Sequence, residues 1–166
     1  MIIRDVHDLD IEGITALYNH YVIHTSISFE EEPVTPSQMA QRVSEVLEKG
    51  LPWLIAEKHG KVLGYAYASP WKSRSAYRFT VEPSVYVSKD AVGEGVGSKL
   101  YRTLLSGLKE QGFQHAIGVI ALPNEASLKL HQSFGFKEAG VFRDIGVKFG
   151  QKWSVAYWQL SLQEWN

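Results

Sequence analysis

The stretch that decides the fold runs from Arg78 to Leu100 and reads RFTVEPSVYVSKDAVGEGVGSKL. Apolar and polar residues alternate over 78–87, which predicts a strand with one apolar face and one face that carries functional groups. Pro83 interrupts this pattern, and a proline cannot donate a hydrogen bond inside a sheet. We therefore expect a β-bulge or a splayed strand near Pro83, followed by a glycine-rich turn into a helix.

The glycine-rich turn, Gly93-Glu94-Gly95-Val96-Gly97, is typical of an anion site. Backbone N–H groups in such a turn can point together at the positive end of the following helix, where a phosphate binds. Two common phosphate motifs do not fit. The dinucleotide fingerprint needs a glycine where Ser98 stands, and the mononucleotide P-loop needs a lysine directly after its last glycine, where the order here is Gly97-Ser98-Lys99. Taken alone, the turn is equally consistent with a flexible helix start.

Around this unit, strand-like and helical patterns alternate without a repeat or a linker. Thr35-Pro36-Ser37-Gln38 is a strong helix start, with Thr35 as N-cap and Gln38 completing a capping box. We expect strands at 2–3, 53–57, 62–68, 78–87, 116–121, 137–149 and 153–162, and helices over 11–22, from 36 to a stop at Gly50, from the glycine turn to Gly112, and from a cap at Asn124 through Phe134. This order predicts one mixed α/β domain, residues 1–166, with a single central sheet.

The composition excludes several classes of function. The 166 residues are 45% hydrophobic and 21% charged, as in an ordinary globular domain, and the absence of cysteine excludes disulfides and a thiol nucleophile. A formal net charge of −1 argues against nucleic-acid binding. His20 and His24 have no third ligand nearby, so we expect no metal. With neither a signal-like start nor a membrane-spanning run, we expect a cytoplasmic protein without membrane partners.

The glycine unit is followed by a strand and then by Asn124-Glu125-Ala126-Ser127 and LHQSFGF at 130–136. Together these motifs resemble the GNAT superfamily of acetyltransferases, over essentially the whole chain. The resemblance implies a mostly antiparallel sheet flanked by helices, with acetyl-CoA as co-substrate. Two positions depart from the family pattern, because Val92 replaces an Arg or Gln and His131 replaces a Tyr.

The resemblance also implies how CoA binds. Amides of the glycine turn would hold its pyrophosphate, and the pantetheine arm would pair with the splayed strand like an added strand, where one amide polarises the thioester carbonyl. The implied cofactor-binding residues are Val85, Tyr86, Val87, Gly93, Glu94, Gly95, Val96, Gly97, Ser98, Asn124 and Ser133.

Three further segments, 28–33 (SFEEEP), 80–87 (TVEPSVYV) and 146–150 (GVKFG), are similar to one branch of this family. That branch acetylates phosphinothricin and methionine sulfoximine or sulfone, which are compact glutamate or glutamine analogues with a free α-amino group. The branch commonly has an Asp after the Trp that corresponds to Trp153, where Ser154 stands here. The resemblance further implies a homodimer, which the aromatic C-terminus would suit.

Acetyl transfer to an amine needs a base, because an α-amino group with a pKa of about 8 is mostly protonated at neutral pH. Glu82 is our candidate, since it directly precedes the expected opening at Pro83; the alternative is a salt bridge with Arg78. A thiolate leaves readily, so a general acid contributes only modestly. His131 could be that acid, or alternatively a buried helix histidine with a satisfied hydrogen bond.

An amino-acid substrate needs a cation for its carboxylate, and the segment 72–78 (KSRSAYR) offers several beside Glu82. Arg74 is the preferred candidate; the alternative is a solvated basic loop. The predicted substrate-binding residues are Phe29, Glu30, Lys72, Ser73, Arg74, Tyr77, Arg78, Glu82, Pro83 and Ser84, with Phe29 and Glu30 included by resemblance only. The competing functions are acetylation of another small amine or of a protein N-terminus, and acyl-CoA sensing without turnover.

Overall fold

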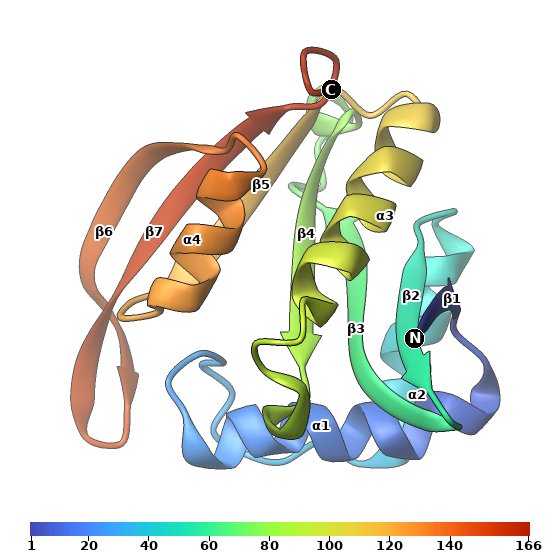
Figure 1. Ribbon diagram of the computed structural model, residues 1–166. Helices are drawn as coiled ribbons and strands as arrows, with labels where there is room; N and C mark the ends of the chain where they lie inside the picture. The colour runs from blue at the N-terminus through green and yellow to red at the C-terminus, as the bar shows by residue number, and fades with distance from the viewer.

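Strands and helices follow one another in the predicted order. In the computed structural model, which describes all 166 residues, the elements are β1 (Ile2–Asp5), α1 (Ile11–His24), α2 (Pro36–Glu48), β2 (Trp53–Lys58), β3 (Lys61–Pro70), β4 (Thr80–Val87), α3 (Val96–Glu110), β5 (His115–Ala121), α4 (Glu125–Ser133), β6 (Lys137–Lys148) and β7 (Gln151–Ser161) (Figure 1). The strands form one sheet in the order β1-β2-β3-β4-β5-β7-β6. Only β4 and β5 are parallel, which confirms the mixed, mostly antiparallel fold.

The feature that positions the site is the separation of β4 from β5. The two strands pair only at Thr80 with His115 and at Val81 with Ala116, and then diverge like the arms of a V (Figure 1). On its other edge β4 stays in regular register with β3, including Ala68 opposite Pro83. Of the two sequence-based expectations, the splayed strand is therefore found and the bulge is not.

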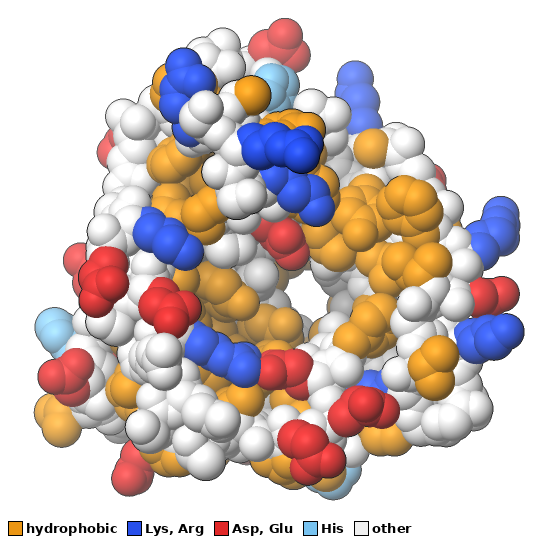
Figure 2. Space-filling view, turned by 180° about the vertical axis from the view of Figure 1, so that it is seen from behind, with side chains coloured by type: hydrophobic (Ala, Val, Ile, Leu, Met, Phe, Trp, Pro, Cys, Tyr) orange, Lys and Arg blue, Asp and Glu red, His pale blue; other side chains and the backbone are white.

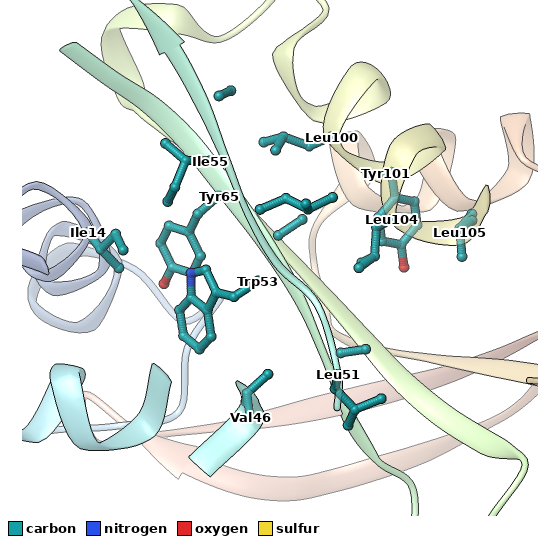
Figure 3. Packing of buried hydrophobic residues seen from close by; sticks show 14 of the residues in the cluster. Ile14, Val46, Leu51, Trp53, Ile55, Tyr65, Leu100, Tyr101, Leu104 and Leu105 are labelled. Carbon is teal, nitrogen blue, oxygen red and sulfur yellow. The ribbon is translucent and has the colours of Figure 1, made fainter. Parts of the chain in front are cut away.

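Helices pack on both faces of the sheet. The apolar stripe of α3 is fully buried against one face through its leucines, Leu100, Leu104, Leu105 and Leu108. On the opposite face Trp53 and Tyr65 project toward α1 and α2 (Figure 3). Burying each such large apolar side chain stabilises the fold by about 1.5–3 kcal/mol. α3 on one face and α1 and α2 on the other thus cover the part of the sheet that contains the β4 arm, and α4 packs on β5.

Local signals set most of the element ends. Thr35 and Gln38 form the predicted capping box, and Gly112, with φ of +89°, ends α3. β4 begins at Thr80 rather than at 78, because residues 75–77 form a short 3₁₀ helix that the alternating pattern does not reveal. The last hairpin turns at Phe149-Gly150, because β6 ends at Lys148 and β7 begins at Gln151, against predicted strands over 137–149 and 153–162. No helix has the length and apolarity to cross a bilayer.

Candidate functional site

A cavity of about 660 Å³ opens where β4 and β5 separate. Its walls come from β4, the glycine turn, the first turn of α3, the end of β5 and α4. The residues that line it from predicted positions are Pro83, Ser84, Val85, Tyr86, Val87, Gly93, Gly95, Val96, Gly97, Ser98, Asn124 and His131. These 12 residues are half of the 24 that line the cavity, and the others include Tyr21, Tyr101 and Leu130.

The glycine turn presents unpaired backbone donors to the cavity. Gly93 and Gly95 have φ of +88° and +76°, the left-handed region that glycine adopts without strain. Gly95 is the N-cap of α3 and supplies no side-chain cap, so the N–H groups of Val96, Gly97 and Ser98 have no acceptor within the helix. Together with the positive end of the helix dipole they form an anion site.

Glu94 within the glycine turn and Val92 just before it differ from the glycines in their contacts. The amide of Glu94 donates to the carbonyl of Ala91 at 3.3 Å, and Glu94 does not line the cavity. Val92 lines it with a side chain that is 67% exposed. The position where the family has a long polar side chain therefore offers only an apolar rim here.

The free edge of β4 offers further backbone groups. The Phe79 carbonyl accepts from the Gln114 amide of the neighbouring segment at 2.8 Å, so the odd-numbered residues that follow turn their backbone toward β5. Beyond Val81 no partner strand is present, and the backbone of Val85 and Val87 faces the cavity. The backbone of Tyr86 faces β3 instead, which narrows the predicted pantetheine partners to Val85 and Val87.

His131 is buried at the wall of the cavity with both ring nitrogens bonded. Its Nδ1 lies 2.7 Å from the Ser127 carbonyl and its Nε2 lies 2.7 Å from the Tyr101 hydroxyl. Because a carbonyl only accepts, Nδ1 carries the proton and Nε2 accepts from Tyr101. Burial lowers the pKa of His131 and so favours this neutral form. The ring lies so close to Gly118 that a Cβ there would be 2.6 Å from Nε2.

Asn124 and Ser133, the cofactor-binding residues predicted at the two ends of α4, differ in their position relative to the cavity. Asn124 caps the helix as expected, accepting from the Ser127 amide at 3.1 Å, and it lines the cavity. Ser133 lies at the far end of α4, donates to the Leu130 carbonyl and does not line the cavity. Tyr101 was missed by sequence reasoning. The available signal was its spacing, since it follows Gly97 by four residues and so lies on the same face of α3.

Glu82 directly follows Val81, the last residue of β4 that pairs with β5, and it does not itself line the cavity. It is half-buried, has no hydrogen-bond or ion-pair partner, and does not pair with Arg78, whose guanidinium instead packs over the Phe79 ring at 4.6 Å. Burial raises the pKa of Glu82, and the positive charge of Lys72 opposes that rise. The carboxyl is therefore an unengaged base of increased basicity.

Among the cations of the loop that precedes β4, Lys72 is the one whose charge reaches Glu82. Its ammonium also lies over the Trp71 ring, 4.9 Å from the centroid. Ser73, Arg74 and Tyr77 are exposed along the loop. The sequence preferred Arg74, whereas Lys72, which is also exposed, is the cation whose charge lowers the pKa of Glu82.

Glu30 is engaged within the protein. Its carboxylate accepts from Arg42 at 2.9 and 2.5 Å and from the Tyr18 hydroxyl. Arg42 lowers the pKa of this carboxyl. Glu30 therefore fixes the segment between α1 and α2, and its charge is balanced before any ligand binds.

The segment between α1 and α2 is also tied to β6. The Lys148 side chain is 1% exposed, and its Nζ donates to the carbonyls of Thr25 and Ser28 at 2.7 and 2.6 Å. Phe29 packs on Gly146, where a Cβ would lie 2.3 Å from the ring. These contacts place Phe29 as a wall between the two segments.

Ser154, where the resembling branch has an Asp, supports the irregular part of β6. Its Oγ accepts from the amide of Asp144 at 3.1 Å, and Asp144 has a left-handed φ of +57°. The hydroxyl therefore stabilises a strained turn of the strand.

Seen from the face opposite to Figure 1, the molecule is hollowed at its centre, and hydrophobic side chains border the hollow together with a few acidic and basic ones (Figure 2). The opening between β4 and β5 thus has two sides. One side carries the anion site of α3, the other carries Glu82, and the free edge of β4 lies between them. This arrangement suits a reaction between a phosphate-bearing donor and a small acceptor that enter from opposite faces.

Comparison with known proteins agrees with this geometry. The GNAT acetyltransferase domain model matches residues 3–155. A phosphinothricin N-acetyltransferase of Alcaligenes faecalis is 46% identical over 150 residues, which are 90% of this chain and 76% of that protein. An L-methionine sulfoximine/L-methionine sulfone acetyltransferase of Salmonella typhimurium is 36% identical over 165 residues, or 99% and 96%. A solved phosphinothricin acetyltransferase from Sinorhizobium meliloti in complex with AcCoA superposes with a TM-score of 0.94 at 35% identity, covering 96% of this chain and 87% of that one.

Proposed function

The chain belongs to the GNAT acetyltransferases and uses acetyl-CoA as its co-substrate, and we propose that it acetylates the α-amino group of a small glutamate- or glutamine-like amino acid. Family membership confirms the resemblance drawn from the glycine turn and the Asn124 motif. The observation that carries the substrate proposal is the unengaged Glu82 carboxyl, which directly follows the last β4 residue paired with β5, beside an opening that contains an anion site. The names of the relatives support an acceptor such as phosphinothricin or methionine sulfone.

The residues present fit CoA. The free amides of Val96, Gly97 and Ser98 suit its diphosphate. The unpaired backbone edge at Val85 suits the amides of its pantetheine arm, whereas the Val87 carbonyl already accepts from the Tyr21 hydroxyl. Acetyl-CoA supplies the activated acetyl thioester. An N–H of the free β4 edge would stabilise negative charge that develops on the thioester oxygen.

Glu82 serves as the base in this proposal. Burial raises the pKa of Glu82, which makes the carboxylate a better proton acceptor than an ordinary glutamate. The proton leaves the α-ammonium group for Glu82, directly or through one water, and frees the lone pair that attacks the acetyl carbon. Lys72, assisted by Arg74, would hold the substrate carboxylate.

His131 would contribute less. In the neutral form its only ring proton is bonded to the Ser127 carbonyl, so donation to a departing thiolate requires either a protonated imidazole or the Tyr101 hydroxyl as a relay. Since thiols titrate near roughly 8.5, the thiolate leaves without a strong acid. We assign His131 a modest effect on turnover.

The same proposal includes a single catalytic domain over 1–166, a cytoplasmic location and a homodimer. The dimer is supported by β6, an edge strand that exposes Val141, Phe142, Ile145 and Val147, with Phe149 exposed in the turn that follows. Such edges are normally covered. Sedimentation of the purified protein as a monomer would contradict the dimer, and recovery of the protein outside the cytoplasmic fraction would contradict the location.

A substrate screen tests the main proposal. Release of the CoA thiol is followed with phosphinothricin, methionine sulfone, methionine sulfoximine, the common amino acids, simple amines and a peptide with a free N-terminus. We expect turnover with the glutamate-like amino acids and little with the peptide. If those amino acids are inert while the peptide or a simple amine reacts, the substrate assignment is wrong.

A further inference from the structure

Lys148, the last residue of β6, is a buried charged residue that the proposed mechanism does not use. Its side chain is 1% exposed and forms no ion pair with a carboxylate. Its ammonium group instead donates to the carbonyls of Thr25 and Ser28, at 2.7 and 2.6 Å. Burying a charge without a counter-ion is unfavourable, and an apolar side chain of similar size would avoid that cost. The lysine is therefore better explained by what it holds in place.

The contact with Thr25 continues to the free edge of β4. The amide and the hydroxyl of Thr25 both donate to the Tyr21 carbonyl in the last turn of α1, at 3.2 and 2.7 Å. The Tyr21 hydroxyl in turn donates to the carbonyl of Val87, and both residues line the cavity between β4 and β5. A continuous series of contacts thus joins the end of β6 to the edge on which the pantetheine arm would lie.

The segment that Lys148 binds borders both sides of the opening. Ile27 lines the cavity and lies between the two residues whose carbonyls accept from Lys148, whereas Phe29 packs on Gly146 of β6. Figure 1 shows the chain that follows α1 beside the tip of the β6–β7 hairpin. Residues 25–35 belong to no helix or strand, so contacts with other segments must fix the position of Ile27.

We propose that Lys148 is a positioning residue for CoA, whose ammonium group fixes the end of α1 and the segment after it. Tyr21 and Ile27 then hold this wall of the cavity where the pantetheine arm can pack against it. Lys148 does not itself line the cavity, so it acts on the edge of β4 through Tyr21. The inference rests on the use of acetyl-CoA and not on the identity of the acceptor.

The test measures the Kd of CoA by calorimetry in the absence of an acceptor. Lys148→Met keeps an unbranched side chain and removes the donors, and we expect CoA to bind about fivefold more weakly, within the range of coupling in one hydrogen-bond network. Arg4→Met is the matched control, because Arg4 pairs with Asp10, the N-cap of α1, and so fixes the opposite end of the same helix. Its Kd should equal that of the unsubstituted protein. An unchanged Kd in Lys148→Met, or an equal rise in Arg4→Met, would overturn the inference.

A double-mutant cycle tests whether Lys148 acts through Tyr21. Tyr21→Phe removes the hydrogen bond to the Val87 carbonyl. In that background Lys148→Met should weaken CoA binding by less than about twofold, because residues that share a network are not additive. A general loss of stability would instead affect binding equally in both backgrounds, and that outcome would contradict the proposed role.

If Lys148→Met does not fold, Thr25→Val tests the next contact in the series. Valine keeps the shape of threonine and removes the hydroxyl that donates to the Tyr21 carbonyl. CoA should then bind about threefold more weakly, the range of one neutral hydrogen bond, and an unchanged Kd would contradict the inference. Glutamate-like amino acids that fail to react while CoA still binds would contradict the proposed function and leave this role of Lys148 intact.

Discussion

The two sides of the opening are built in different ways. The side with the anion site is built largely from one continuous stretch, in which β4, the glycine turn and the first turn of α3 follow one another within 80–98, and the end of β5 and α4 complete its wall. The acceptor side consists of side chains from distant segments, such as Glu30 bonded to Arg42 and Lys148 bonded to the Ser28 carbonyl. Backbone geometry follows from local glycine and proline positions, whereas side-chain clusters depend on the complete fold. The continuous stretch is accordingly the part that the sequence describes well.

The largest effect should come from the residue where the two sides meet. Glu82→Gln keeps the shape of the side chain and removes the base, so we expect turnover to fall about 10²–10⁴-fold with little change in acetyl-CoA KM. Glu138→Gln, an exposed carboxylate on β6, is the control. Steady-state kinetics with both substrates varied separates the two parameters. Turnover that survives in Glu82→Gln would remove Glu82 from the role of base.

A smaller effect should be confined to the side with the anion site. Gly95→Val places a branched side chain at φ of +76° beside the free amides, so acetyl-CoA KM should rise roughly tenfold, as expected for loss of one charge-assisted hydrogen bond. Gly112→Val is the matched control, because Gly112 has φ of +89° at the other end of α3 and does not line the cavity. Thermal unfolding should show a similar loss of stability in both variants. An equal rise of KM in both would mean that the turn is not the phosphate site.

The sequence predicted the fold and the part of the cavity wall formed by β4 and the glycine turn, because the signals for both are local. The capping box at Thr35, the cap at Asn124 and the splayed strand at Pro83 each follow from neighbouring residues. Tyr101 was not predicted as a site residue, because its spacing along α3 is that of a core residue. Only the fold brings its hydroxyl to the ring of His131, thirty residues later.

The side chains on the acceptor side could not be predicted, because their contacts join segments that are distant in the sequence. Nothing near Arg42 indicates that it will bond Glu30, and nothing near Lys148 indicates that it will be buried against the segment after α1. The sequence could offer only the basic loop at 72–78, and it could not rank Lys72 above Arg74. That ranking needs the distance of each charge from Glu82, which the fold alone supplies.

The smallest effect should come from Lys72→Met, which tests whether Lys72 or Arg74 acts more strongly on Glu82. Burial raises the pKa of Glu82 and the Lys72 cation lowers it, so Lys72→Met should raise this pKa further. Because the base works only when deprotonated, kcat/KM is lost as pH falls through the Glu82 pKa, and the acid limb of the profile should move to higher pH in the variant. The amine of the substrate titrates near pH 8 with both proteins, so a second limb of the pH profile at that pH should stay unchanged.

Since Lys72 is exposed, the displacement of the acid limb should shrink as salt is added. Arg74→Met, which removes a cation from the same loop, should move the limb less, and a larger displacement in Arg74→Met would restore the ranking that the sequence suggested.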